Sequence, residues 1–172
     1  MKDKFISQID KIAFLDRDGV INVKLAEGCY VTEWGQFKFL DGAIAGIKLL
    51  NDFGYKVIVV TNQRGIAKKI MTEYSLNQIH QKMVESITNF GGKIEAIYYC
   101  PHDIGQCNCR KPDVGLFLQA EEVYTIDKIN SFMIGDSISD IEAGKKYGIQ
   151  SYLLKDKENL LSCVRKILIV NK

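Results

Sequence analysis

Two acidic residues stand directly after the first apolar run of the chain, Ile12–Leu15. Asp16 and Asp18 are one residue apart, and two carboxylates at that spacing suit a nucleophile and a separate proton donor or acceptor. Gly19 follows them and lets the backbone turn sharply. An acidic pair beside a glycine is also a common solvated turn, so this motif alone leaves both interpretations open.

Thr61 and Asn62 follow a second apolar run, residues 57–60. A threonine hydroxyl and the backbone N–H groups of such a loop can hold phosphate oxygens. As a single signal, the pair is only a weak loop pattern.

Asp136 and Asp140 follow the fourth predicted strand, residues 131–134. Their carboxylates are oxygen ligands of the kind that Mg²⁺ takes. The alternative is an ordinary helix start, because Ser139 and Glu142 have the spacing of a capping box.

Three of the five cysteines and one of the two histidines lie within ten residues of each other. Cys100, His102, Cys107 and Cys109 supply enough ligands for a closed tetrahedral Zn²⁺ site. Free buried thiols or a disulfide are the alternatives, but neither explains why these residues gather in one loop. Because four protein ligands leave no open position, we expect a structural zinc that stiffens the loop.

The composition is that of an ordinary globular protein, with 172 residues, 47% hydrophobic and 26% charged. We expect one domain over residues 1–172. The 23 basic and 21 acidic residues give a net charge of only +2, which argues against nucleic acid as the main partner. Residues 1–11 lack the apolar region of a secretory signal, and no apolar stretch is long enough to span a membrane. We therefore expect a cytoplasmic monomer with no membrane partner.

Strands that alternate with helices position these motifs, and the alternation predicts a three-layer α/β sandwich around a parallel, Rossmann-like sheet. The chemistry then lies where open α/β sheets bind ligands, at the carboxyl ends of the strands. We expect strands at residues 12–15, 57–60, 94–99, 131–134 and 151–154, and helices at 41–53, 75–90, 112–124, 139–147 and 160–168. No segment between the first helix and the third strand is long enough to fold alone, so no cap domain is expected.

Taken together and in this order, the motifs resemble the haloacid dehalogenase superfamily of aspartyl phosphotransferases across nearly the whole chain. The motifs that carry the resemblance are Asp16-x-Asp18-Gly19, Thr61-Asn62, Arg110-Lys111-Pro112 and Gly135-Asp136-x-x-x-Asp140.

This resemblance implies phosphomonoester hydrolysis. Asp16 attacks phosphorus, and Asp18 protonates the leaving alkoxide and then activates water. Thr61 and Lys111 stabilise the phosphoryl oxygens, and Asp140 orients its neighbours. Catalytic Mg²⁺ is held by Asp16, the Asp18 carbonyl and Asp136.

The zinc loop, with Cys109-Arg-Lys-Pro112 at its end, looks like the capless subgroup of heptose bisphosphate and histidinol-phosphate phosphatases. The heptose enzymes match better, through Ile97-Tyr-Tyr-Cys-Pro-His102 and a substrate loop at residues 28–31 that carries extra residues before Tyr30. The resemblance implies removal of the 7-phosphate of D-glycero-D-manno-heptose 1,7-bisphosphate, in heptose biosynthesis. The substrate-binding residues expected are Tyr30, Asn62, Arg64 and Arg110. Histidinol phosphate or another small sugar phosphate is the alternative substrate.

Two other classes of protein are alternatives. A phosphorylated receiver needs its aspartate at the end of the third strand, where this chain has Cys100-Pro-His102. A non-catalytic binding module is the second alternative. We expect His80 to be a surface or core residue and not a ligand, and Trp34 to be a packing anchor. Cys29 and Cys163 are expected to be free thiols.

Overall fold

Five parallel strands form a single sheet in the order β3-β2-β1-β4-β5 in the computed structural model, which describes residues 9–155 and 158–170. Apolar and β-branched residues fill its central strands, as is typical of a sheet covered on both faces. The strands are β1 (Ile12–Leu15), β2 (Lys56–Asn62), β3 (Ala96–Cys100), β4 (Phe132–Gly135) and β5 (Gln150–Leu153).

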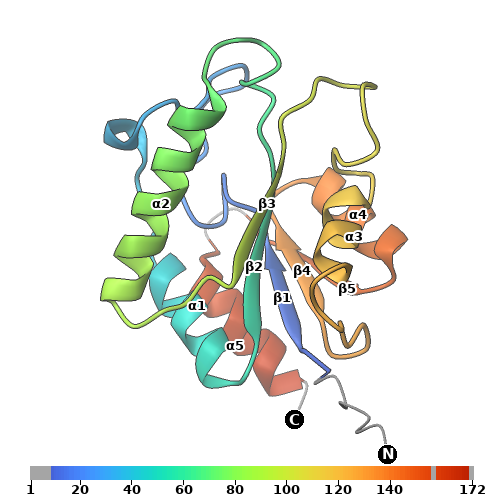
Figure 1. The fold of residues 1–172 in the computed structure, drawn as a ribbon. Coiled ribbons are helices and arrows are strands. Elements are labelled where there is room, and N and C mark those ends of the chain that lie inside the picture. The colour runs from blue at the N-terminus through green and yellow to red at the C-terminus, as the bar shows by residue number, and fades with distance from the viewer. Residues whose placement is uncertain (1–8, 156–157, 171–172) are drawn as a thin grey trace, which may run out of the picture.

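Helices cover both faces of the sheet, which confirms the predicted three-layer sandwich. The helices are α1 (Ala43–Asp52), α2 (Glu73–Asn89), α3 (Gly115–Glu121), α4 (Ile138–Tyr147) and α5 (Leu160–Val170). Figure 1 shows α1, α2 and α5 on one side of the sheet and α3 and α4 on the other. None of the helices in the described ranges is long and apolar enough to cross a membrane.

The central strand β1 divides the core between the two faces. Its four residues are fully buried, and successive side chains point to opposite faces. Ala13 and Leu15 pack toward α1, α2 and α5, whereas Ile12 and Phe14 pack toward α3 and α4. This burial fixes the end of β1, and therefore Asp16, against the rest of the sheet.

Capping side chains explain two of the helix starts that differ from those predicted. Helix α2 begins at Glu73, because the Thr72 hydroxyl accepts a hydrogen bond from the Ser75 backbone N–H. Helix α4 begins at Ile138, and its capping box joins Ser137 to Asp140. The capping box of Ser139 and Glu142, which was the alternative interpretation of this segment, is therefore wrong, since Ser137 and Asp140 cap the helix.

The other boundaries shift by a few residues. Helix α3 is shorter than predicted, since residues 112–114 form a turn before Gly115. Strand β2 is longer and includes Thr61 and Asn62, which pair with β3.

The long segment between β1 and α1 is largely irregular and is packed around aromatic side chains. Trp34 begins a short 3₁₀ helix (Trp34–Gln36) and stacks on Phe37, with ring centroids 5.0 Å apart. Phe39 meets both rings edge-on. The prediction that Trp34 is a packing anchor is confirmed. The predictions for residues 1–11 lie largely outside the described residues, and the single domain over 1–172 stays a prediction.

Candidate active site

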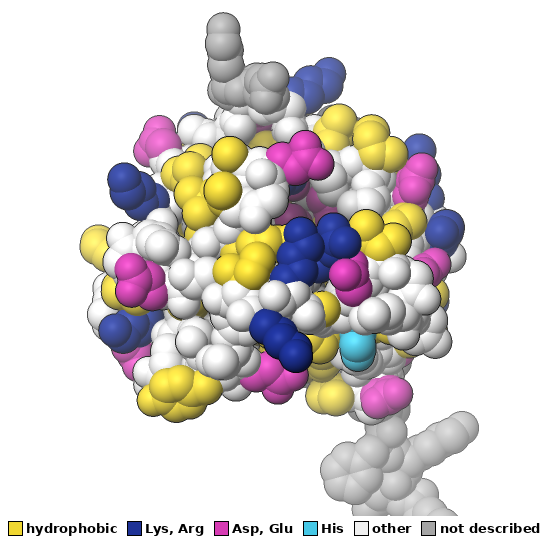
Figure 2. Space-filling view, turned by 90° about the horizontal axis from the view of Figure 1, so that it is seen from above, with side chains coloured by type: hydrophobic (Ala, Val, Ile, Leu, Met, Phe, Trp, Pro, Cys, Tyr) yellow, Lys and Arg dark blue, Asp and Glu magenta, His cyan; other side chains and the backbone are white. Residues whose placement is uncertain are grey.

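A cavity of about 320 Å³ opens at the carboxyl ends of β1, β2 and β4. Seen from above in Figure 2, Lys and Arg side chains lie beside a hollow that contains acidic side chains. The cavity is large enough for a small phosphorylated metabolite. The residues of its wall that were predicted for the site are Asp16, Asp18, Tyr30, Thr61, Asn62, Arg110, Lys111, Asp136 and Asp140.

Lys111 connects two of the carboxylates at the bottom of this cavity. Its Nζ atom lies 2.9 Å from Asp16 Oδ1 and 2.5 Å from Asp140 Oδ1, and it also donates to the Val60 carbonyl. The side chain is 1% exposed. Burial acts to lower the pKa of Lys111, but the two carboxylates outweigh it and the pKa is raised. The ammonium group is therefore a fixed positive charge beside Asp16.

Asp16 itself has an unusual environment for a carboxylate. Its burial raises the pKa of its carboxyl group to about 7, against the opposing effect of Lys111. One ammonium group thus compensates the buried negative charge only partly. A further cation at this position would favour the ionised form.

Asp136 faces Asp16 and fits a divalent cation. Carboxylate oxygens of Asp16, Asp136 and Asp140 all lie within 4.8 Å of one another. Asp136 Oδ1 is buried and has no hydrogen-bond partner among the described residues, while Lys24 Nζ lies 2.6 Å from Oδ2. Gly19 allows the turn after β1 to lie close to Asp136, since a Cβ atom at position 19 would lie 2.3 Å from Asp136 Oδ2. Oxygen donors with excess negative charge match the ligands of Mg²⁺.

Asp18 is held on the opposite side of the turn. Arg17 Nη2 lies 2.9 Å from both carboxylate oxygens, and Asn22 and Gln63 each donate one more hydrogen bond. Burial acts to raise the pKa of Asp18, but Arg17 and the hydrogen bonds outweigh it and the pKa is lowered. Asp18 is therefore a carboxylate in this arrangement.

The residues at the end of β2 orient the site. Thr61 is buried, and its hydroxyl accepts a hydrogen bond from Gln63 Nε2 at 3.0 Å. Asn62 exchanges two hydrogen bonds of 3.1 Å with the backbone of Lys111. Asn62 was predicted to bind substrate, which stays a prediction. In the structure it fixes the backbone from which Lys111 reaches Asp16.

The three other residues predicted to bind substrate lie in two places. Tyr30 and Arg110 line the cavity, and Arg110 Nη1 is buried without a partner among the described residues. Arg64 does not line it and pairs with Asp103, with 2.5 Å between Nε and Oδ1. Of the two arginines predicted to bind substrate, Arg110 is therefore the one that is placed to meet an anion in the cavity.

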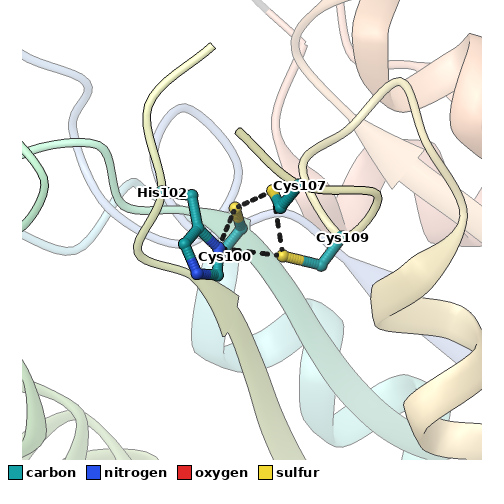
Figure 3. A group of neighbouring side chains, drawn as sticks. All are labelled: Cys100, His102, Cys107 and Cys109. Atoms are coloured by element: carbon teal, nitrogen blue, oxygen red, sulfur yellow. Dashed lines mark hydrogen bonds between the residues drawn. The ribbon is translucent and has the colours of Figure 1, made fainter. Parts of the chain in front are cut away.

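The four predicted zinc ligands point toward one another (Figure 3). Neighbouring Sγ atoms of Cys100, Cys107 and Cys109 are 3.3 to 3.5 Å apart, and His102 Nδ1 lies 3.3 and 3.7 Å from two of them. Ligands about 2.3 Å from a tetrahedral zinc are roughly 3.7 Å apart, close to these values. All three cysteines are free. The cluster can hold zinc, and it adjoins Arg110.

Two residues near the site, His80 and Lys24, were not assigned a function from the sequence. His80 of α2 is buried and contacts Arg17, which confirms a core position but adds a polar partner. Its signal was its place among the apolar residues of one helix face. Lys24 reaches Asp136 from the long loop, and nothing in the sequence indicates that contact. Cys29 and Cys163 are free, as predicted.

Comparison with known proteins gives consistent results. Residues 11–159 match the family model described as "Polynucleotide kinase 3 phosphatase". A Pasteurella multocida relative named D-glycero-beta-D-manno-heptose-1,7-bisphosphate 7-phosphatase is 40% identical over 151 residues, 84% of the chain and 80% of the relative. A Rhodopseudomonas palustris relative of the same name is 34% identical over 91% of the chain and 89% of its own length.

Solved structures also match along nearly the whole chain. The D,D-heptose 1,7-bisphosphate phosphatase from B. bronchiseptica, complexed with magnesium and phosphate, has a TM-score of 0.79 at 27% identity. The match covers 93% of the chain and 99% of that structure. A second phosphatase of that name, from Burkholderia thailandensis, has a TM-score of 0.63 at 26% identity over 92% of the chain and 99% of that structure.

Proposed function

We propose that this chain, which is a phosphatase of the haloacid dehalogenase superfamily, removes the 7-phosphate of D-glycero-D-manno-heptose 1,7-bisphosphate. The chain belongs to the same family as its heptose-bisphosphate 7-phosphatase relatives. The reaction is Mg²⁺-dependent and passes through an acyl phosphate on Asp16, the aspartyl-phosphate. The observation that carries this proposal is the position of Asp16, buried at the bottom of the cavity beside the ammonium group of Lys111.

In the first step, an Asp16 carboxylate oxygen attacks the phosphorus atom, and the bond from phosphorus to the sugar oxygen breaks. Lys111 and Thr61 both line the cavity, and Lys111 lies beside Asp16. The ammonium group of Lys111 and the hydroxyl group of Thr61 donate hydrogen bonds that stabilise the phosphoryl oxygens. The negative charge of the bound phosphate favours protonation of Asp18, which is otherwise a carboxylate. The protonated carboxyl group then gives its proton to the leaving alkoxide.

In the second step, water attacks the phosphorus atom of the aspartyl-phosphate, and Asp18, now a carboxylate, takes the proton of that water. The Asp16–phosphorus bond breaks, and inorganic phosphate leaves. Asp18 thus ends the cycle protonated, ready for the next substrate. The contacts with Arg17, Asn22 and Gln63 favour the carboxylate that this step requires.

Asp16, Asp136 and the Asp18 carbonyl would hold the magnesium ion. When bound, the ion supplies positive charge that reduces the repulsion between the attacking carboxylate and the phosphate. Asp136 Oδ1, which has no hydrogen-bond partner in the described part of the chain, and the raised pKa of Asp16 support this assignment. Lys24 would leave Asp136 Oδ2 or share it when the ion enters.

Zinc binding by the cysteine and histidine cluster gives a separate prediction. Protein purified without chelator is expected to contain one equivalent of zinc, and Cys107→Ser is expected to lower both the zinc content and the melting temperature, because the folded loop depends on the metal. Metal analysis and calorimetry measure these quantities. Cys29→Ser is the control, since Cys29 is exposed and outside the cluster. Wild-type protein without zinc contradicts the assignment.

The second phosphate of the substrate decides between this sugar and histidinol phosphate. Arg110 lines the cavity, and its buried Nη1 has no partner within residues 9–155 and 158–170. A charge-assisted hydrogen bond to an anion contributes about 1.5–3 kcal/mol. Histidinol phosphate carries a cationic amine in place of a second anion. We therefore expect kcat/KM for the bisphosphate to exceed that for histidinol phosphate by at least about tenfold. Equal values, or the opposite order, contradict the substrate assignment but leave the phosphatase activity in place.

Replacing Arg110 tests the same point from the side of the protein. Arg110→Ala is expected to lower kcat/KM for the bisphosphate by about tenfold or more, because the second phosphate loses its partner. Hydrolysis of p-nitrophenyl phosphate, which has no second anion, is expected to change little. Arg64→Ala is the matched control, since Arg64 pairs with Asp103 outside the cavity. Equal losses on both substrates contradict a role in recognition.

A further inference from the structure

His80 is a polar residue in the buried stripe of α2. The other buried members of that stripe are apolar: Leu76, Ile79, Met83 and Ile87. His80 is 6% exposed, and a buried imidazole is costly unless its polar atoms are paired. Its partner lies across the core, in the turn after β1.

That partner is the buried guanidinium group of Arg17, whose Nη1 lies 3.2 Å from His80 Nε2. A guanidinium group can only donate hydrogen bonds, so Nε2 must be the acceptor and the ring proton must lie on Nδ1. Burial and the charge of Arg17 lower the pKa of His80 to about 3, which keeps the ring neutral. Tyr99 packs against the ring in an edge-on arrangement, with centroids 6.0 Å apart.

The same guanidinium group holds Asp18. Nη2 of Arg17 contacts both oxygens of that carboxylate at 2.9 Å, while Nη1 points to His80. The three side chains thus form a continuous line from α2 to the cavity. Because the guanidinium group is planar and rigid, the hydrogen bond to His80 at one end fixes the direction of the other end.

We propose that His80 is a positioning residue for proton transfer: through Arg17 it sets the place of the Asp18 carboxyl group relative to the leaving oxygen of the substrate. This proposal rests on the role of Asp18 in the proposed function. His80 does not line the cavity and takes no part in bond making.

Loss of the acceptor has a defined structural consequence. With an apolar residue at position 80, Nη1 of Arg17 is left without a partner in a buried place, and Arg17 Nε already has none among the described residues. The guanidinium group then turns toward another acceptor and moves Asp18 with it. Asp16 is held by Lys111 and keeps its place.

Substrates with different leaving groups distinguish a displaced Asp18 from a change at Asp16. A sugar alkoxide needs a proton to leave, whereas p-nitrophenolate leaves without one. Since kcat/KM covers only the steps up to loss of the leaving group, it reports acid assistance without the later hydrolysis of the phosphoenzyme. For His80→Leu we expect kcat/KM for the heptose bisphosphate to fall by about tenfold or more, and that for p-nitrophenyl phosphate by less than about twofold.

Three further variants complete the test. His80→Gln keeps an acceptor and is expected to retain most of the wild-type ratio between the two substrates. His80→Ala lacks the acceptor and is expected to behave as His80→Leu does, which keeps the test valid if one of them folds poorly. Ile87→Ala is the control for lost packing in α2, two turns away from His80, and is expected to leave the ratio unchanged.

Equal losses on the two substrates, or no loss in either acceptor-free variant, overturn the positioning role. The positioning role is also overturned if His80→Gln loses as much kcat/KM for the heptose bisphosphate as His80→Leu does. Failure of the proposed function is distinguishable, because the wild-type protein would then not hydrolyse the heptose bisphosphate in the presence of Mg²⁺, whether or not it hydrolyses p-nitrophenyl phosphate.

Discussion

Asp16→Asn is expected to lower turnover by at least about four orders of magnitude, because the variant lacks the covalent nucleophile of the reaction. An amide keeps the shape of the side chain and can still accept the hydrogen bond from Lys111 Nζ. It cannot attack phosphorus, and it is a poorer ligand for Mg²⁺. The loss is therefore chemical and not structural.

Steady-state kinetics with saturating Mg²⁺ measure this loss, and thermal unfolding checks that the variant folds. The melting temperature is expected to stay within a few degrees of the wild-type value, because the buried carboxylate is replaced by a neutral group of equal size. Asp52→Asn, on the exposed end of α1, is the control and should be fully active. Turnover near the wild-type rate in Asp16→Asn would exclude an aspartyl-phosphate.

Lys111→Met is expected to reduce both activity and stability. Its ammonium group is the nearest cation to Asp16 and Asp140 among the described residues, and all three are buried. Removing one partner from a buried ion pair costs about 3–5 kcal/mol, because a charge is left uncompensated. Turnover is expected to fall by about 10²–10³-fold, since the phosphoryl oxygens also lose a charged donor.

The double variant Lys111→Met/Asp140→Asn separates these two effects. Asp140→Asn removes one of the two buried negative charges, so part of the lost free energy of unfolding is expected to return. Activity is not expected to return, because the donor to the phosphoryl group is still absent. Recovery of both quantities together would mean that Lys111 acts on structure alone. Chemical denaturation and steady-state kinetics measure the two quantities.

The sequence predicted the arrangement of the site because each acidic motif follows directly after a predicted strand. β1 was predicted at its observed bounds, and the Asp16 and Asp136 carboxylates meet since β1 and β4 are neighbours in a parallel sheet. The Cys and His cluster was predicted from spacing, and its four side chains converge. The family resemblance is confirmed by relatives at 34 to 41% identity.

Tertiary contacts between distant segments could not be read from the sequence. The partner of Arg64 is Asp103, 39 residues away, and this contact draws the arginine out of the cavity. The contact between His80 and Arg17 depends on how α2 packs over the turn after β1, which no local pattern encodes. Helix starts were misplaced for a local reason, since Thr72 and Ser137 compete with nearby serines as caps.

Phosphorus NMR of the reaction with D-glycero-D-manno-heptose 1,7-bisphosphate tests the central claim most directly. With the wild-type enzyme and Mg²⁺, the resonance of the 7-phosphate is expected to disappear while that of the 1-phosphate remains and inorganic phosphate appears in equal amount. The same sample with Asp16→Asn is expected to stay unchanged over that time. Loss of the 1-phosphate resonance first, or an unchanged spectrum with the wild-type enzyme, would contradict the account.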